Sequence, residues 1–130
     1  MTTLDLKQIQ ISSAIDLFSK GEINQALDAV QDLIKDYPNE PVLFNIRGAC
    51  YADLGQLDVA VTNYKEAITI KPDYAKAHFN LAGSLHDLGQ LETAVQSYQK
   101  TIEIEPNYAE AYNNLGNVFQ ELEQGDSAVQ

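Results

Sequence analysis

Apolar residues return with helical spacing in two successive stretches in the middle of the chain. In the stretch that begins at Pro41 they are Leu43, Phe44, Cys50, Tyr51 and Leu54, and in the stretch from Leu57 to Ile70 they are Val61, Tyr64, Ala67 and Ile68. A spacing of three or four residues places such side chains on one face of a helix. The pattern therefore predicts two amphipathic helices joined by a short turn.

Glycine and proline mark the ends of these helices, and the same marks recur along the chain. Glycine closes a helix C-terminus by adopting the left-handed conformation, and proline ends a helix because it has no N–H group to donate. The residues that recur 34 positions apart are Gly21, Gly55 and Gly89, then Pro38, Pro72 and Pro106, then Ala26, Ala60, Ala94 and Ala128. This interval predicts a repeated helix pair that buries its apolar face by stacking on copies of itself.

The repeat divides residues 1–130, which we interpret as a single domain, into three complete units and one truncated unit. These are Lys7–Glu40, Pro41–Tyr74, Ala75–Tyr108 and Ala109–Gln130. The last unit keeps its first helix, but its second is cut shortly after Ala128. Gly125 also falls two positions later than the other turn glycines, and Glu123 stands at the expected place. We infer a fragment, or an end that packs on another molecule.

Aromatic, small and proline residues within the units make the pattern more specific. The second unit has Phe44, Gly48, Tyr51, Ala60, Tyr64 and Pro72, and the fourth has Tyr112, Leu115, Gly116, Phe119 and Ala128. The third unit has Leu81, Ala94, Tyr98 and Pro106. In the third unit, His78 stands at the aromatic position and Ala82 replaces the glycine. This combination resembles the tetratricopeptide repeat (TPR) family over about residues 7 to 130. The resemblance implies an all-α, right-handed superhelical solenoid of antiparallel helix pairs with about 3.5 repeats, and a role in protein binding.

Composition and charge narrow the classes of partner. The 130 residues are 45% hydrophobic and 21% charged, with a formal net charge of -11. This charge argues against a nucleic-acid partner, because binding a polyanion requires clustered Lys and Arg, and it favours basic or neutral proteins. The sequence has no run of 18 apolar residues, so we expect no membrane segment. Cys50 has no second cysteine to pair with, which fits a reducing compartment, and we expect a cytoplasmic protein.

The sequence has no catalytic constellation, so we expect no enzyme activity, no cofactor and no metal site. It lacks a phosphate-binding glycine loop, an HExxH motif and a calcium loop. His78 is expected to pack at the aromatic position. His86 is expected to be solvated, with a place facing a groove as the alternative. Cys50 is expected to be an inert buried thiol.

The resemblance implies a ligand-binding groove lined by the first helix of each unit, mainly through its second, fifth, sixth, ninth, twelfth and thirteenth residues. Asn80 and Asn114 hold the sixth position and look like the asparagine ladder of the TPR domain of O-GlcNAc transferases. An amide both donates and accepts hydrogen bonds, so these two are the leading candidates for contact with a peptide backbone. Asn45, Asn113 and Asn117 extend the polar strip. The alternative is that these asparagines lie on an ordinary solvated helix face or bond locally.

Charged residues at the same positions suggest the charge of a partner. Asp53, Asp87 and Glu121 hold the thirteenth position of three successive units. If this row faces the groove, it predicts a preference for a segment that carries Lys or Arg. The alternative is three solvated acids at helix ends. Lys76, at the second position of the third unit, is a further candidate for ligand binding.

The first unit has apolar residues at the matching positions, namely Ile11, Ile15 and Phe18, with Phe79 further along. This strip either accepts apolar anchors of a partner or is buried by Met1 to Leu6 folding over it. The carboxylate clamp by which some TPR domains hold chaperone C-termini requires Lys and Asn where this chain has Ile11 and Ile15. The resemblance therefore does not extend to that activity.

Three functions are compatible with these features. The leading hypothesis is a protein-interaction module that binds an extended peptide segment of a partner protein in the groove. The second is a structural scaffold that forms a homo-oligomer through the truncated C-terminal unit. The third is the N-terminal segment of a larger transferase-type enzyme.

Overall fold

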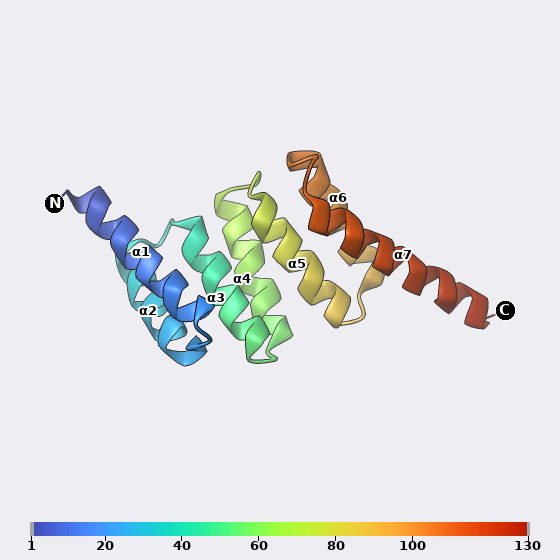
Figure 1. The fold of residues 1–130 in the computed structure, drawn as a ribbon, viewed down its shortest axis with the longest axis horizontal. Coiled ribbons are helices and arrows are strands. Elements are labelled where there is room, and N and C mark those ends of the chain that lie inside the picture. Colours follow the sequence, from blue (N-terminus) through green and yellow to red (C-terminus); the bar gives the residue numbers. More distant parts are fainter. Residues whose placement is uncertain (1, 130) are drawn as a thin grey trace.

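Seven helices in a row make up the part of the chain that the structure describes (Figure 1). The computed structural model describes the backbone of residues 2–129 and the side chains of residue 2 and residues 5–125. The helices are α1 (Thr3–Ser19), α2 (Ile23–Asp36), α3 (Pro41–Asp53), α4 (Leu57–Ile70), α5 (Ala75–Asp87), α6 (Leu91–Ile104) and α7 (Ala109–Val129). This range contains no strand, and the predicted all-α solenoid is confirmed.

The turns between paired helices form as the glycines predict. Gly21, Gly55 and Gly89 have φ angles of +80°, +79° and +80°, in the left-handed region that glycine adopts without strain. In the middle turn, the N–H of Gln56 donates to the Tyr51 carbonyl at 2.9 Å, so a carbonyl at the end of α3 is satisfied. Helices α2, α4 and α6 each end two residues before a proline. Because the chain reverses at each turn and each loop, the odd-numbered helices all run in one direction (Figure 1).

Small residues lie where the helices cross. Ala14, Ala26, Ala60 and Ala94 are fully buried. Gly48 has a similar role, because a Cβ atom added there would lie 2.6 Å from a ring carbon of Tyr64. The absence of a side chain at this point lets α3 and the aromatic ring of α4 approach each other closely.

The fourth unit differs from the expectation. The sequence predicted a second helix that is cut after Ala128, but α7 continues without a turn to Val129. Glu123 stands where the other units have glycine, so the left-handed turn that ends their first helices is disfavoured here. Ala128 lies within α7, and its side chain is outside the described residues.

The N-terminal segment does not fold over the first unit. Helix α1 begins at Thr3, four residues before the expected start of the unit, and residues up to Leu6 continue the helix. The Thr2 side chain accepts a hydrogen bond from the Asp5 N–H at 3.1 Å, and Asp5 accepts one from the Thr2 N–H at 3.3 Å. This capping box stabilises the early start. The hypothesis that Met1 to Leu6 cover the apolar strip is therefore wrong for the described part of the segment, and Met1 itself lies outside it.

Candidate functional site

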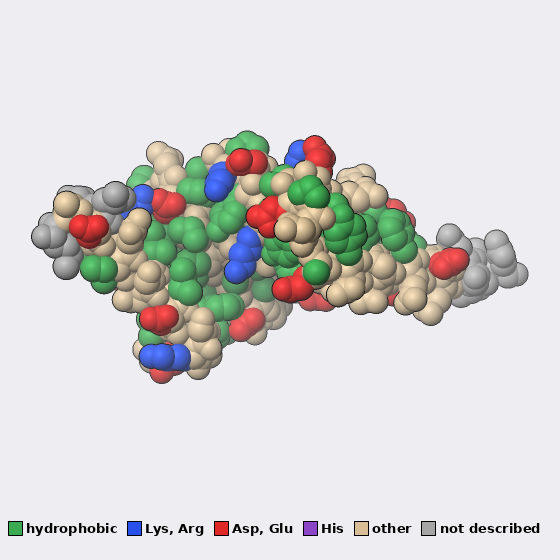
Figure 2. All heavy atoms as spheres, turned by 45° about the horizontal axis from the view of Figure 1, so that its top comes forward, with side chains coloured by type: hydrophobic (Ala, Val, Ile, Leu, Met, Phe, Trp, Pro, Cys, Tyr) green, Lys and Arg blue, Asp and Glu red, His purple; other side chains and the backbone are tan. Residues whose placement is uncertain are grey.

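A cavity of about 460 Å³ lies between the first helices of the first three units. Helix α1 contributes Ile15 and Phe18, α3 contributes Val42, Asn45, Ile46 and Asp53, and α5 contributes Lys76 and Asn80, with Tyr64 and Tyr74 completing the wall. The wall is mainly apolar, and its polar groups are amides, a few hydroxyls and two charges. Figure 2 shows hydrophobic side chains spread over one face of the molecule, from its N-terminal half to beyond the middle, with charged side chains among them. A concave apolar site with a few polar groups is the usual form of a ligand pocket.

The two charged residues of the cavity lie at opposite ends of it. Lys76 is in the first turn of α5 and Asp53 is the last residue of α3, and both are exposed. Because α3 and α5 run in the same direction, the ammonium group lies at the end where these helices begin and the carboxylate at the end where α3 stops (Figure 1). A segment that fills the cavity can therefore pair an acidic group at one end and a basic group at the other.

The amides in the cavity are already joined to each other. Asn80 Nδ2 donates to Asn45 Oδ1 at 3.0 Å, and Asn45 is only 5% exposed. Burial raises the pKa of Tyr74, and a hydrogen bond from Asn45 opposes part of that rise. The buried Asn45 therefore orients Asn80, which stays partly exposed at the wall. Of the two, Asn80 is the one with capacity left for a ligand.

The predicted site residues divide between this cavity and the second half of the molecule. Inside the wall are Asn45, Asn80, Lys76 and Asp53, and outside it are Asn113, Asn114, Asn117, Asp87 and Glu121. Asn113, Asn117 and Asp87 are exposed. Asn114 is partly buried, and its amide opposes part of the rise that burial causes in the pKa of Tyr98. These residues of the second half therefore lie outside the cavity, and most of them are exposed.

Glu121 has a partner that the sequence did not predict. His86 Nε2 lies 2.7 Å from Glu121 Oε1, and the two side chains are 24% and 48% exposed. His86 was expected to be solvated, but it bonds to this carboxylate instead. His86 and Glu121 are 35 positions apart, which is about one repeat, so they lie on the neighbouring helices α5 and α7. Glu121 is therefore less available to a basic ligand than Asp53 or Asp87.

The apolar strip of the first unit lies partly in the cavity. Ile15 and Phe18 line it, while Ile11 packs against the core of the first unit. Phe79 belongs elsewhere, because its ring centroid lies 5.8 Å from that of Tyr98 and 5.0 Å from that of Tyr108. The strip therefore ends before Phe79, which stabilises the packing of the third unit.

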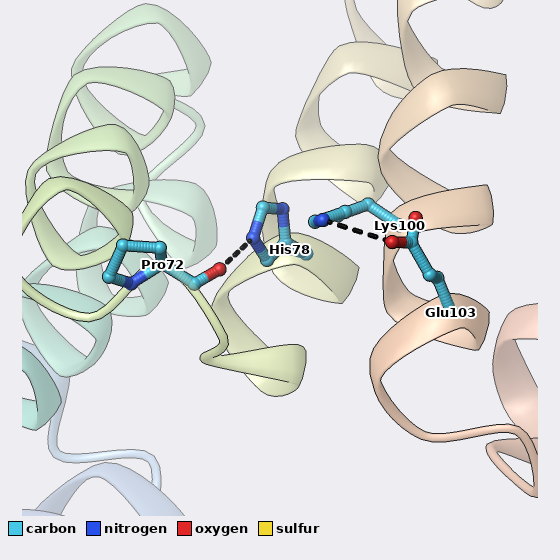
Figure 3. Close-up of polar contacts among 4 residues, drawn as sticks. All are labelled: Pro72, His78, Lys100 and Glu103. Atoms are coloured by element: carbon cyan, nitrogen blue, oxygen red, sulfur yellow. Dashed lines mark hydrogen bonds and ion pairs between the residues drawn. The ribbon is translucent and has the colours of Figure 1, made fainter.

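His78 packs at the aromatic position, as predicted. It is 8% exposed, and its Nε2–H group donates to the Pro72 carbonyl at 2.9 Å (Figure 3). Tyr112 holds the same position in the fourth unit, and its hydroxyl donates to the Pro106 carbonyl at 2.9 Å. Nearby Lys100 pairs with Glu103 at 3.4 Å (Figure 3). His78 therefore takes the place of a tyrosine that ties a first helix to the end of the preceding helix.

The remaining nucleophile is buried. Cys50 is fully inaccessible, and burial, together with the negative charge of Asp53, raises its pKa from 9.0 to about 11. The thiolate is therefore scarce at neutral pH, as expected of an inert thiol. Within the described range, no three His, Cys, Asp or Glu side chains gather closely enough to hold a metal ion. Among the same residues, no helix has the length and apolar character needed to span a membrane.

The sequence analysis did not name every residue of the cavity wall. Val42, Ala49 and Ala52 hold the second, ninth and twelfth positions of the second unit, so the positional rule could have named them. Tyr64 and Tyr74 come from a second helix and from a connecting loop, and no rule about first helices identifies them.

Comparison with known proteins gives a consistent family. Residues 48–86 and 84–123 match the family model described as TPR repeat, so more than half of the chain is matched. The first TPR domain of Spaghetti (RPAP3), solved with the HSP90 peptide SRMEEVD, is 28% identical, with a TM-score of 0.85 over 89% of this chain and 92% of that chain. The first TPR domain of human RPAP3 is 26% identical, with a TM-score of 0.88 over 93% of this chain and 95% of that chain.

Longer proteins also contain regions similar to this chain. The peroxisomal targeting signal receptor of Saccharomyces cerevisiae is 26% identical over 84 residues, which are 65% of this chain and 14% of the receptor. Hsp70-Hsp90 organizing protein 2 of Arabidopsis thaliana is 37% identical over 59 residues, which are 45% of this chain and 10% of that protein. The chain therefore matches only a small part of the length of these relatives.

The predicted similarity to O-GlcNAc transferases holds for the fold. A mutant O-GlcNAc transferase of Thermobaculum terrenum has a TM-score of 0.84 at 24% identity, over 91% of this chain and 23% of that chain.

Proposed function

Because this chain belongs to the tetratricopeptide repeat family, we propose that it is a non-catalytic protein-interaction module whose groove binds an extended peptide segment. The observation that carries the proposal is the cavity between α1, α3 and α5. It is concave and mainly apolar, and it offers the amide of Asn80 to a peptide backbone. Asn114 and the exposed Asn113 and Asn117 continue the polar surface along α7.

The cavity wall suggests the chemistry of the bound segment. Ile15, Phe18 and Ile46 surround space for one bulky apolar side chain, which would supply most of the affinity as a buried anchor. Asp53 and, further along, Asp87 favour a basic residue beside the anchor, while Lys76 accepts an acidic group at the other end. Such charges mainly set specificity and the rate of association, and salt weakens them.

The HSP90 peptide of the Spaghetti structure is not carried over to this chain. That peptide is acidic, whereas Ile11 and Ile15 stand where a carboxylate clamp requires Lys and Asn. We propose instead a segment with an apolar anchor and at least one Lys or Arg. The acidic peptide SRMEEVD then serves as a comparison ligand.

The test is a binding assay by fluorescence anisotropy with four labelled peptide sets, basic or acidic, each with Leu or Ser at the centre. The basic set with Leu is expected to bind best. Replacing Ile15 by Ser, at a side chain that is 40% exposed, is expected to weaken the Leu sets about tenfold and leave the Ser sets unchanged. Gln99→Ala, on the exposed part of α6, is the matched control. Stronger binding of SRMEEVD than of the basic set would show that the charge preference is wrong.

The amides have a separate test. The double variant Asn80→Ala and Asn114→Ala is expected to bind the best peptide more weakly at a temperature well below its melting point. Its melting temperature is expected to fall somewhat, because Asn80→Ala leaves the buried Oδ1 of Asn45 without its donor. An unchanged affinity would mean that these amides do not contact the ligand, and the groove proposal would then rest on the apolar anchor alone.

Self-association is the second candidate function. Tyr112 and Phe119 on α7 are 50% and 47% exposed, and paired aromatic surfaces can hold a homo-oligomer together. Light scattering over a concentration series tests this, and a monomer at every concentration removes it. The third hypothesis, a segment of a larger transferase-type enzyme, and the cytoplasmic location stay predictions.

A further inference from the structure

A second hollow in the surface lies on the side of α5 that faces away from the cavity. It is a groove of about 480 Å³ between α4 of the second unit and α6 of the third, and α5 forms its floor. On α5, His78 and Leu81 line the groove, whereas Lys76 and Asn80 line the cavity. With about 3.6 residues per turn, these two pairs point to roughly opposite sides of the helix. The groove is therefore separate from the cavity, and the helices that form it belong to complete units.

The equivalent place one unit earlier is partly filled by a long side chain. Arg47 and Asn63 stand 34 positions before Leu81 and Ser97. The Arg47 Nε–H group donates to Asn63 Oδ1 at 2.6 Å, and the guanidinium carbon lies 5.2 Å from the centroid of the Phe44 ring. Leucine and serine are shorter and cannot form this pair, so the groove stays open in the third unit.

The surface inside the groove is apolar with hydroxyl groups beside it. Ile68 of α4 is partly buried, and Leu81 of α5 is 6% exposed. Ser97 of α6 is 8% exposed, and the Thr69 hydroxyl on α4 donates to the Lys65 carbonyl at 2.9 Å. The two aliphatic side chains therefore offer a contact for one apolar side chain of a ligand.

Two lysines give the groove a charge opposite to that of the whole chain. The chain has only eight Lys and Arg residues and a net charge of -11, yet Lys65 on α4 and Lys100 on α6 both line the groove and are exposed. Figure 3 shows the Lys100 side chain extending from α6 towards His78 on α5. Lys100 pairs with Glu103 at 3.4 Å, but Glu103 is 71% exposed, and exposed pairs contribute little. A ligand carboxylate can therefore replace Glu103 as the partner of this ammonium group.

We propose that the groove between α4 and α6 is a docking site for an acidic segment of a partner protein. One apolar side chain of the segment contacts Ile68 and Leu81, and carboxylates on either side of it pair with Lys65 and Lys100. Opposite charges steer and align such a partner, and the apolar contact supplies affinity. The site does not depend on the function proposed for the cavity, which favours a basic segment.

The probe for this site is a fluorescein-labelled peptide, Glu-Glu-Leu-Glu-Glu, titrated into the full chain and followed by fluorescence anisotropy. The expected result is saturable binding that weakens as salt is raised. The peptide Glu-Glu-Ser-Glu-Glu is the matched control and is expected to bind about tenfold more weakly, because it lacks the apolar side chain. Equal affinity of the two peptides would overturn the proposal.

Two lysine variants test whether the ammonium groups of the groove hold the peptide. The double variant Lys65→Gln and Lys100→Gln is expected to weaken binding about tenfold. The double variant Lys20→Gln and Lys35→Gln removes the same charge from exposed positions of the first unit and is expected to have little effect. Equal losses in the two double variants would overturn the proposal, because the peptide would then respond only to net charge.

Two threonine variants locate the binding on α4. Thr69→Glu places a negative charge in the groove and is expected to weaken binding about tenfold. Thr62→Glu is the matched control, because both threonines are exposed on α4 and donate to the carbonyl four residues earlier, at 2.9 Å for Thr69 and 3.2 Å for Thr62. Thr62 lies outside the groove wall, so its variant is expected to bind almost normally. Equal losses in these two variants would place the peptide elsewhere and overturn the proposal.

Discussion

Helices α3 and α7 carry the same stripe of residues on one face, Phe44, Gly48 and Tyr51 on α3 and Tyr112, Gly116 and Phe119 on α7. Of the two, only α3 has a described helix packed over this stripe. Tyr64 of α4 covers Gly48, whereas the space over Gly116 is open. Phe44 is buried, and Tyr112 at the same position is half exposed. The comparison shows that the same residue pattern contributes different amounts to the free energy of unfolding in different places. An aromatic or a glycine in this stripe stabilises the fold only where a second helix removes it from water.

The largest difference is expected for the aromatic rings. Tyr98 is 1% exposed and Phe119 is 47% exposed. Replacing Tyr98 by Ala leaves a cavity between α5, α6 and α7 and is expected to cost roughly 3–5 kcal/mol of unfolding free energy. Phe119→Ala removes a half-exposed ring and is expected to cost about 1 kcal/mol or less. Urea unfolding followed by circular dichroism measures both, and similar losses would mean that the face of α7 is covered in solution.

Substitutions at the two glycines are expected to change the free energy of unfolding by smaller amounts, and in opposite directions. Gly48→Ala places a methyl group against the Tyr64 ring and is expected to destabilise the protein by about 1–3 kcal/mol. Gly116→Ala meets no atom, and alanine favours the helix over glycine, so this change is expected to stabilise the protein by about 0.5–1 kcal/mol. Thermal melts of the two variants check the signs. A loss of stability in Gly116→Ala would contradict the comparison.

The covered helix α3 is also expected to make the stability of the protein depend on pH above 9. Burial raises the pKa of Cys50 on the covered helix α3 to about 11, so the folded state keeps the thiol proton after the unfolded state has released it. Stability is therefore complete below pH 9 and declines as the pH rises from 9 towards 11. Cys50→Ala is expected to show a shallower decline over this window in urea unfolding series. The tyrosines add to the decline above pH 10, because burial raises the pKa of Tyr64 and Tyr98. An identical decline in Cys50→Ala would show that the thiol is not buried in the folded state.

The smallest effect is expected for the polar contact between α5 and α7. Replacing Glu121 by Gln weakens its bond to His86 and is expected to cost about 0.2–1 kcal/mol, because both groups are partly exposed. High salt should reduce the difference from the unchanged protein. The double variant with His86→Gln supplies the control, and additive losses in this pair would mean that the contact contributes nothing.

The sequence alone predicted most of the fold. Glycine is required at Gly21, Gly55 and Gly89 because the turns need positive φ, and the prolines stop the helices that precede them. Local backbone chemistry decides both features, so they are visible without coordinates. The prediction failed after Glu123, because a second helix was still expected although the turn glycine is missing there, and α7 instead runs on to Val129.

The candidate site could be predicted only in part. The positions of the first helices pointed to Asn45, Asn80, Lys76 and Asp53, which line one cavity. The same rule gave no reason for Phe79 to pack on Tyr98 and Tyr108, or for Asn80 to donate to Asn45. Those contacts join different units, and their distances depend on how the units stack.

By itself, the amino-acid sequence determined the repeat length, the helix ends and the apolar face of each helix, because periodicity, capping and backbone sterics act over a few residues. Only the tertiary structure decided which of those faces has a neighbour. Burial of Gly48 under Tyr64 and the open space over Gly116 arise from the same local sequence pattern. The physical reason is that desolvation and close packing are properties of two surfaces in contact, and one stretch of chain specifies only one of them.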